Sequence, residues 1–384
     1  MDTGTILKNV EGVLPAIREQ REAIEQARRL PRQVVDRLIG TGVFSLNVPR
    51  AIGGPEASPL EGMQAIERVA SADGSAGWCT MIGLTSNIAA GYMNEPGAKE
   101  IFTDPSVPAA AIAGPIGQAV PSEGGYRVSG RWPFASGITH APWVWAGCLV
   151  MENGAPKMTP HGPAMVHAFL PTKDIEIHDT WYVSGLAGTG SNDFSAADVF
   201  VPEHLTFSLF DPTGHRSEPL YQIPVVNLFV AQVASVSLGI ARAALDELTE
   251  LAATKVPTLS QVPLADKPVA QIELARMEAA LGGARAFLHE VIEELFQIAS
   301  AGGTPSMRLR ALGRAAAVNA VETAASITRQ ATTLAGGRAL YSSSPMQRHA
   351  RDAAAITHHF TVSSHTWEEA GRVLLGRDPT VPLF

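Results

Sequence analysis

Two short loops carry the first side chains that could do chemistry. Residues 126–129 alternate apolar and polar side chains, which predicts a half-buried strand, and this strand leads to Ser136 and Gly137. Glycine at the end of a strand lets a flat ring approach the backbone closely, and serine adds a hydroxyl. The second loop, 188–191, has the sequence Gly-Thr-Gly-Ser and offers further hydroxyl and N–H donors. We therefore expect these loops to line a ligand site.

Histidines near the C-terminus form the second candidate group. His358 and His359 are adjacent, and imidazole has a pKa near neutrality, as proton transfer at ordinary pH requires. Adjacent residues of a helix face different directions, so we expect at most one of the two to point into a site. The alternative is that both lie on a helix surface.

Composition and charge argue against several classes of partner. The 384 residues carry a net charge of −8 without a basic run, which disfavours nucleic acid and anionic membranes. Cys79 and Cys148 match no metal or redox spacing, so we expect no metal site and two buried thiols in a reducing compartment. The charged N-terminus has no apolar signal-peptide core. These features predict a cytoplasmic protein.

The elements that must position the candidate residues begin with helices. Residues 5–92 have helical periodicity, with a turn-rich break at 47–55 and a last helix, 76–92, that we expect Ser75 to cap. Strand patterns follow at 126–130, 144–150, 165–170 and 198–202, and their spacing suggests a small barrel or sandwich.

The C-terminal part of the chain is helical again. We expect four long helices at 225–253, 267–301, 307–334 and 346–375, joined by short loops as in an up-and-down bundle. Asn227 and Gln232 interrupt the apolar start of the first, so it fits a buried core helix better than a membrane span. The predicted fold is α+β and mostly α, with a helical domain (1–107), a β-domain (108–215) and a four-helix bundle (216–384).

This order of zones, together with four motifs, resembles the acyl-CoA dehydrogenase superfamily over nearly the whole chain. The motifs occur in matching order: Asp73-Gly74-Ser75-Ala76-Gly77-Trp78, Trp132 to Gly137, Asp179-Thr180-Trp181 with Thr189-Gly190-Ser191, and Arg351-Asp352-Ala353. They are most similar to the flavin-dependent monooxygenase branch. That branch includes the oxygenase components of two-component aromatic hydroxylases and the desulfurisation monooxygenases.

The position of the catalytic base separates the two kinds of chemistry in this superfamily. Similar dehydrogenase sequences carry Tyr-Glu-Gly after the Arg-Asp motif, and here Phe360 stands where the glutamate would be, with His359 before it. The other usual place for the base is the first bundle helix, and residues 225–245 contain no Asp or Glu. Phenylalanine cannot accept a proton, so the sequence favours a monooxygenase over a dehydrogenase.

The resemblance implies a reaction and a set of cofactors. Reduced flavin (FADH2 or FMNH2) would react with O2 by way of a C4a-hydroperoxyflavin to hydroxylate a hydrophobic aromatic or heteroaromatic molecule. The chain has no dinucleotide-binding loop of the G-x-G-x-x-G type, so a separate flavin reductase would supply the reduced flavin. The resemblance also implies a homotetramer. A dehydrogenase or oxidase with tightly bound FAD, and a non-catalytic scaffold, remain the alternatives.

The resemblance also implies roles for individual residues. Ser136 would donate to the flavin, and His359, or else His358, would be the substrate base or orient the reacting oxygen. The flavin cavity would be lined by Trp132, Gly137, Thr189, Gly190 and Ser191, although Trp132 could instead be a core residue. Gly336 and Gly337 would meet the diphosphate of a neighbouring subunit's flavin, but the usual arginine of that site is not evident, which leaves FAD or FMN open. Asn87 and His140 are candidates for contact with the substrate.

Overall fold

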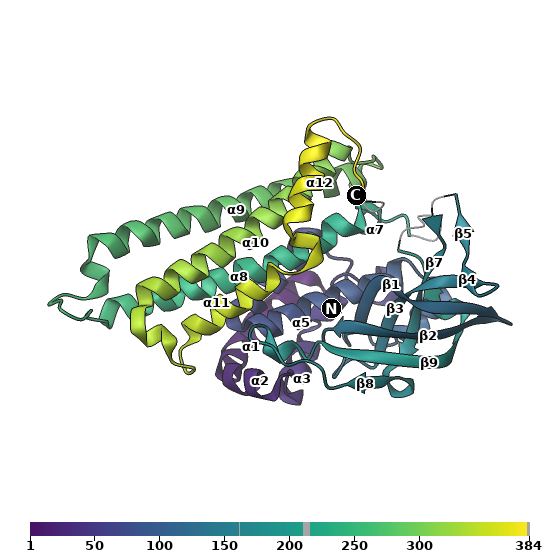
Figure 1. Ribbon diagram of the computed structural model, residues 1–384, viewed down its shortest axis with the longest axis horizontal. Coiled ribbons are helices and arrows are strands. Elements are labelled where there is room, and N and C mark those ends of the chain that lie inside the picture. The colour runs from purple at the N-terminus through teal and green to yellow at the C-terminus, as the bar shows by residue number, and fades with distance from the viewer. Residues whose placement is uncertain (161, 210–215, 382–384) are drawn as a thin grey trace.

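The computed structural model describes residues 1–160, 162–209 and 216–381. Figure 1 shows a long bundle containing α8–α11 on one side, a curved sheet on the other, and the N-terminal helices packed against both. This is the expected α+β architecture. The predicted domain boundary after His215 lies outside the described residues.

The N-terminal part is helical up to Ile101. Its helices are α1 (Thr3–Glu19), α2 (Arg21–Ala27), α3 (Arg32–Thr41), α4 (Pro59–Ala72), α5 (Gly74–Asn87) and α6 (Glu95–Ile101). The expectation that Ser75 caps α5 is wrong. Asp73 is the cap, because its carboxylate accepts from the backbone N–H of Ala76 at 2.8 Å. Ser75 is thereby free to accept from Gly188 N, at 3.1 Å.

An eight-stranded sheet forms most of the middle part. Its strands are β1 (Ala110–Ser122), β2 (Gly125–Ala135), β3 (Trp143–Glu152), β4 (Ala155–Pro156), β7 (Met165–Pro171), β8 (Glu176–His178), β9 (Asn192–Pro202) and β10 (Thr206–Phe207). The main order is β10-β7-β3-β1-β2-β9-β8, with β4 beside β3; β5 (Met158–Thr159) and β6 (Gly162–Pro163) pair separately. Strand β2 runs to Ala135, so Ser136 stands directly at its end, as expected.

The C-terminal part begins with α7 (Pro219–Gln222), α8 (Val225–Thr254), α9 (Pro268–Ser300) and α10 (Met307–Ala335). The last three match the predicted helices closely. The predicted fourth helix is wrong, because it is broken into α11 (Pro345–Ile356) and α12 (Ser364–Leu374). The break contains Thr361, Val362 and Ser363, which are β-branched or cap-forming residues that favour helix ends over interiors. His358 and His359 therefore lie in a bend between helices.

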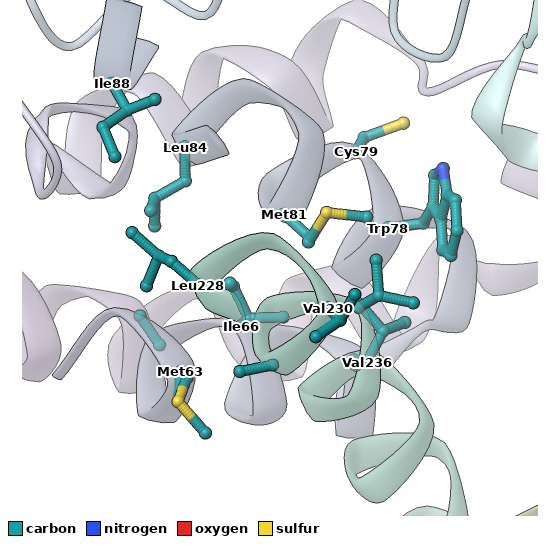
Figure 2. Close-up of a cluster of buried hydrophobic side chains, with 14 of the residues drawn as sticks. Met63, Ile66, Trp78, Cys79, Met81, Leu84, Ile88, Leu228, Val230 and Val236 are labelled. Carbon is teal, nitrogen blue, oxygen red and sulfur yellow. The ribbon is translucent and has the colours of Figure 1, made fainter. Parts of the chain in front are cut away.

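Helix α8 is long and apolar enough to cross a membrane, but 89% of its most apolar window is buried by the rest of the chain. This is the burial of a core helix, as expected. Helix α5 packs against α8 and α4 in the cluster drawn in Figure 2. Helices α5 and α4 approach closely because residue 77 is a glycine that faces Ala70. A Cβ added at Gly77 would lie 2.4 Å from the Ala70 Cβ. In Figure 2 the indole nitrogen of Trp78, next to Gly77, lies on the side away from Val230 and Val236.

Candidate active site

A series of hydrogen-bonded hydroxyl groups joins the loop with Ser136 and Gly137 to the loop at 188–191, the two loops that the sequence predicts to line a ligand site. The Oγ atoms of Ser136 and Ser191 are 2.6 Å apart, and Ser191 Oγ is 2.6 Å from Thr189 Oγ1. Trp78 Nε1 donates to Ser136 Oγ at 2.9 Å, and Thr189 Oγ1 donates to the Leu186 carbonyl at 2.8 Å. All three hydroxyl residues are buried.

The Leu186 carbonyl at one end of this series determines which hydroxyl donates and which accepts in each hydrogen bond. A hydroxyl has one hydrogen, and Thr189 must use its own for the Leu186 carbonyl, which can only accept. Ser191 therefore donates to Thr189, and Ser136 donates to Ser191. The hydroxyl hydrogen of Ser136 is taken up by Ser191, so Ser136 Oγ can only accept a hydrogen bond from a ligand. This corrects the expectation that Ser136 donates to the flavin.

Further hydrogen bonds hold the second loop in place. Gly137 N donates to the Thr189 carbonyl at 3.0 Å, which joins the ends of the two loops. Gly137 and Gly190 both have positive φ, at 75° and 55°, a conformation that favours glycine. Leu186 N donates to Asp352 Oδ1 of α11 at 2.6 Å. The loop is thus fixed from both the sheet and the bundle.

Asp352 is a buried carboxyl group in the Arg-Asp motif. Burial raises its pKa to about 7, and the neighbouring Asp73 carboxylate acts in the same direction. The Leu186 N–H and the charge of Arg351 partly oppose this shift. Its protonation state therefore changes near neutral pH, at the point where α11 holds the loop.

His359 is the histidine that points inward. Its ring centroid lies 5.6 Å from that of Trp78 and 5.6 Å from that of Phe229, while His358 is exposed. Burial lowers the pKa of His359 to about 4, so the ring is neutral at ordinary pH. His359 Nδ1 accepts from Thr361 N at 3.4 Å, and the Thr361 hydroxyl, which can also donate, lies 2.8 Å from the same nitrogen. The neutral ring then carries its hydrogen on Nε2 and offers it as a donor.

A cavity of about 380 Å³ with mostly apolar walls lies next to the aromatic residues that pack against His359, although His359 itself does not line it. Phe229 and Phe360, whose rings both flank His359, line it. Ile82 and Thr85 of α5 also line it, and they share one helix face with Trp78 because they follow it by four and seven residues. The size suits a small organic ligand.

Two predicted site residues have structural roles instead. Trp132 is fully buried, stacks on Phe194 at 4.9 Å and donates from Nε1 to the Gly147 carbonyl at 3.0 Å, so it belongs to the core of the sheet. Asn87 is also fully buried. Its Nδ2 donates to the Phe44 and Val107 carbonyls, and its Oδ1 accepts from Ala109 N. Both predicted ligand contacts are therefore wrong, since these polar groups already serve the protein interior.

The other predicted residues lie around or away from this centre. The His140 ring lies beside Gly137, and burial lowers its pKa to about 4. It belongs to the loop after Ser136 and is not part of the cavity wall. Gly336 and Gly337 follow α10, beside Lys255, which donates to the Ala335 carbonyl. Their predicted role depends on a second subunit.

Several residues that build the site carried no predicted role. Trp78 and Asp352 belong to motifs that resemble the superfamily, and these motifs could have marked both residues as part of the site. Phe229 stands in an apolar helix and Arg314 in an Ala-rich one, where no local pattern marks them. The three-dimensional arrangement alone brings Arg314 to the cavity wall.

Comparison with known proteins agrees with this architecture. The acyl-CoA dehydrogenase N-terminal domain matches residues 10–102, and the acyl-CoA dehydrogenase C-terminal domain matches residues 231–364. An indole-3-acetate monooxygenase of Pseudomonas putida is 33% identical over 96% of this chain and 94% of its own length. The oxygenase component of an FADH2-dependent resorcinol hydroxylase of Rhizobium is 28% identical over 97% and 95%. The crystal structure of the HsaA monooxygenase from Mycobacterium tuberculosis superposes with a TM-score of 0.92 at 29% identity, with all of both chains covered.

The fold and these matches define the class: the chain belongs to the acyl-CoA dehydrogenase family. Within that family it is a flavin-dependent monooxygenase, as the motifs and the missing carboxylate predicted. The cofactor is a reduced flavin and the oxidant is O2.

Proposed function

We propose that this chain is the oxygenase component of a two-component system and hydroxylates an aromatic or heteroaromatic substrate held in the cavity beside His359. The observation that carries the proposal is a series of contacts from Ser136 to the cavity. Trp78 donates to Ser136, and His359 packs against Trp78. Phe229 and Phe360, which line the mostly apolar cavity, pack against His359. Relatives named for indole-3-acetate and resorcinol support an aromatic substrate.

The residues around Ser136 fit a reduced flavin. Ser136 offers an acceptor, and the N5 atom of a flavin ring carries a hydrogen only in the reduced state. Gly137 and Gly190 have no side chain to keep a flat ring away from the backbone. When bound, the flavin supplies the electrons that activate O2 for insertion of one oxygen atom.

His359 orients the reacting oxygen by a hydrogen bond rather than removing a proton from the substrate. Its pKa of about 4 makes it a weak base, and its Nε2–H is a donor. Trp78 and Phe229 pack edge-on against the ring, which restricts its orientation. This favours the orienting role over the alternative role of substrate base.

We also propose a site for the diphosphate end of the flavin and an oligomeric state for the chain. Exposed apolar residues near Gly336 and Gly337, among them Leu340 and Tyr341, suit contact with another subunit and hence a homotetramer. We assign FAD rather than FMN on the name of the resorcinol hydroxylase relative. A cytoplasmic location is consistent with the free, buried thiols Cys79 and Cys148.

The decisive experiment adds pre-reduced FAD or FMN to the protein under O2 with a panel of aromatic compounds. We expect a hydroxylated product with one oxygen atom from O2, detected by mass spectrometry with ¹⁸O2, and little free peroxide. If every flavin equivalent ends as peroxide, or if the protein instead reduces its flavin with an acyl-thioester, the proposal is wrong.

A further inference from the structure

Ser86 is a buried serine in the wall of the mostly apolar cavity. It lies in the last turn of α5, is 1% exposed, and lines the cavity together with Ile82 and Thr85 of the same helix. Its hydroxyl has no hydrogen-bond partner among the residues that the structure describes. Nearly all buried hydroxyl groups have a partner, and one without a partner costs free energy, so the Ser86 hydroxyl calls for an explanation.

The usual partner of a hydroxyl inside a helix is the carbonyl one turn earlier. Thr85, the neighbour of Ser86, follows this rule, because its Oγ1 donates to the Met81 carbonyl at 2.7 Å. Ser235 of α8 likewise donates to the Ala231 carbonyl, at 2.9 Å. The Ser86 hydroxyl makes no such bond, and it is therefore available to a molecule that enters the cavity.

The backbone at Ser86 is held firmly on both sides. Its carbonyl accepts from Trp145 Nε1 of β3 at 3.1 Å. The next residue, Asn87, donates from Nδ2 to the Val107 carbonyl at 3.0 Å, in the segment that precedes β1. A serine side chain has one heavy-atom torsion, so its hydroxyl can turn towards a ligand while this backbone stays in place.

The other hydroxyl groups of the cavity wall already have partners within the protein. Thr366 Oγ1 donates to the Thr361 carbonyl at 2.9 Å, and Thr361 Oγ1 lies 2.8 Å from His359 Nδ1. Among the described residues of this wall, Ser86 thus provides the hydroxyl that still lacks a hydrogen bond.

The charges of the wall indicate the kind of ligand that suits it. Arg314 and Glu369 both line the cavity and have opposite signs. Burial lowers the pKa of Arg314 to about 10, and the charge of Glu369 opposes this shift. The Glu369 carboxylate in turn accepts from Thr380 N at 2.7 Å. Because the two charges offset each other, the wall suits an uncharged ligand better than an ion.

We propose that Ser86 is a specificity-determining residue, whose hydroxyl donates a hydrogen bond to an uncharged oxygen atom on the aromatic substrate, either a hydroxyl or a carbonyl oxygen. This deepens the proposed function and rests on it. The apolar side chains of the wall, among them Ile82 and Phe229, surround the aromatic ring. A site that hydrogen-bonds a polar group of its substrate rejects an analogue without that group, because the buried partner is then left unpaired.

The test compares ligands of similar shape that differ in this oxygen atom. The hydroxyindoles are paired with the methylindoles substituted at the same ring position, and acetophenone is paired with α-methylstyrene. Dissociation constants are measured by calorimetric titration under anaerobic conditions with reduced flavin present, so that no turnover occurs. A preference within the indole pairs identifies a hydroxyl group, and a preference for acetophenone identifies a carbonyl group.

We expect wild type to prefer the oxygen-bearing member of at least one pair. Ser86→Ala then weakens binding of that ligand by roughly tenfold, as expected for the loss of one hydrogen bond, and of its apolar counterpart by less than about threefold. Equal losses for both members of every pair, or a wild type without preference in any pair, overturn the inference.

Two further variants separate recognition from a structural role. Ser86→Thr keeps the hydroxyl and should retain the preference. Ser237→Ala removes a fully buried hydroxyl of α8 that also lacks a partner among the described residues but does not line the cavity, so it should leave the preference unchanged. Neither Ser86→Ala nor Ser237→Ala loses a hydrogen bond within the protein, so thermal unfolding should occur at the wild-type temperature or above it.

The outcome is distinguishable from a failure of the proposed function. Binding is measured without turnover, so a preference that depends on Ser86 supports the inference even if no product forms under O2. Hydroxylation of aromatic compounds that is equally efficient in wild type and Ser86→Ala, with no preference in any pair, supports the proposed function and overturns the inference.

Discussion

Asp352 and Ser136 lie at the two ends of one run of hydrogen bonds. Asp352 accepts from Leu186 N, the Leu186 carbonyl accepts from Thr189, and Thr189 connects through Ser191 to Ser136. The carboxyl group at one end has a pKa near 7, and the hydroxyl at the other end faces the proposed flavin site. The bundle and the sheet therefore share one polar connection through the loop.

The first prediction concerns Asp352 and pH. Its pKa is about 7 in the folded protein and 3.8 in an unfolded chain, so between these values the folded state binds more protons. Stability from this group is present below about pH 4 and is lost as the pH rises to about 7. Asp352→Asn should remove this part of the pH dependence, measured as the urea-unfolding free energy at pH 5 and pH 8. Asp36→Asn, at an exposed site, is the control, and equal slopes for Asp352→Asn and wild type would contradict the assignment.

The second prediction concerns the direction of the hydroxyl run. Ser191→Ala removes the acceptor for the Ser136 hydrogen, so Ser136 can then donate to the bare N5 of oxidised flavin. We expect the preference for reduced over oxidised flavin to fall by roughly tenfold, in line with one hydrogen bond. Anaerobic titrations with both redox states measure it. Ser129→Ala, on the strand β2 that leads to Ser136, is the control. A preference unchanged by Ser191→Ala would refute the deduced direction.

The third prediction separates the two histidines. His359→Asn should reduce product formation at least tenfold and raise peroxide release, because the ring that packs against Trp78 and the cavity-lining Phe229 is lost. His358→Asn should behave as wild type, because His358 is exposed. The pKa of His359 falls from 6.5 to about 4 on folding, so the unfolded chain binds more protons between these values. Its contribution to stability is thus lost as the pH falls from about 6.5 through 4, and only His359→Asn should abolish that loss. Product yield and unfolding at pH 5 and pH 7 test both statements.

Much of this architecture follows from local sequence patterns. The helices α8, α9 and α10 and the strand that ends at Ser136 are long periodic segments, and periodicity is a local property. The break at His359 was missed because apolar spacing continues across it, while the cap-forming residues 361–364 interrupt the backbone.

Trp132 was misplaced for a different reason. It belongs to the same motif as Ser136, but the register of β2 against β9 shifts between Trp132 and Ala135, so regular alternation does not carry over from one residue to the other. The partners of Trp132 come from β3 and β9. Arg314, which lines the cavity, had no local signature at all, since the cavity wall combines elements that are far apart in the chain. Motifs located the site, and packing decided which of their residues face it.

Asn87 provides the last prediction, because its polar atoms join segments that are distant in sequence. Nδ2 donates to the Phe44 carbonyl at 3.1 Å and to the Val107 carbonyl at 3.0 Å, and Oδ1 accepts from Ala109 N at 2.9 Å. Asn87→Ala leaves these buried backbone groups unpaired and should cost about 2–4 kcal/mol of unfolding free energy. The folded fraction should keep its substrate KM within about twofold, because no polar atom of Asn87 is left for a ligand. A KM raised tenfold at unchanged stability would return Asn87 to the substrate site, so urea unfolding and steady-state kinetics on one preparation decide between the two roles.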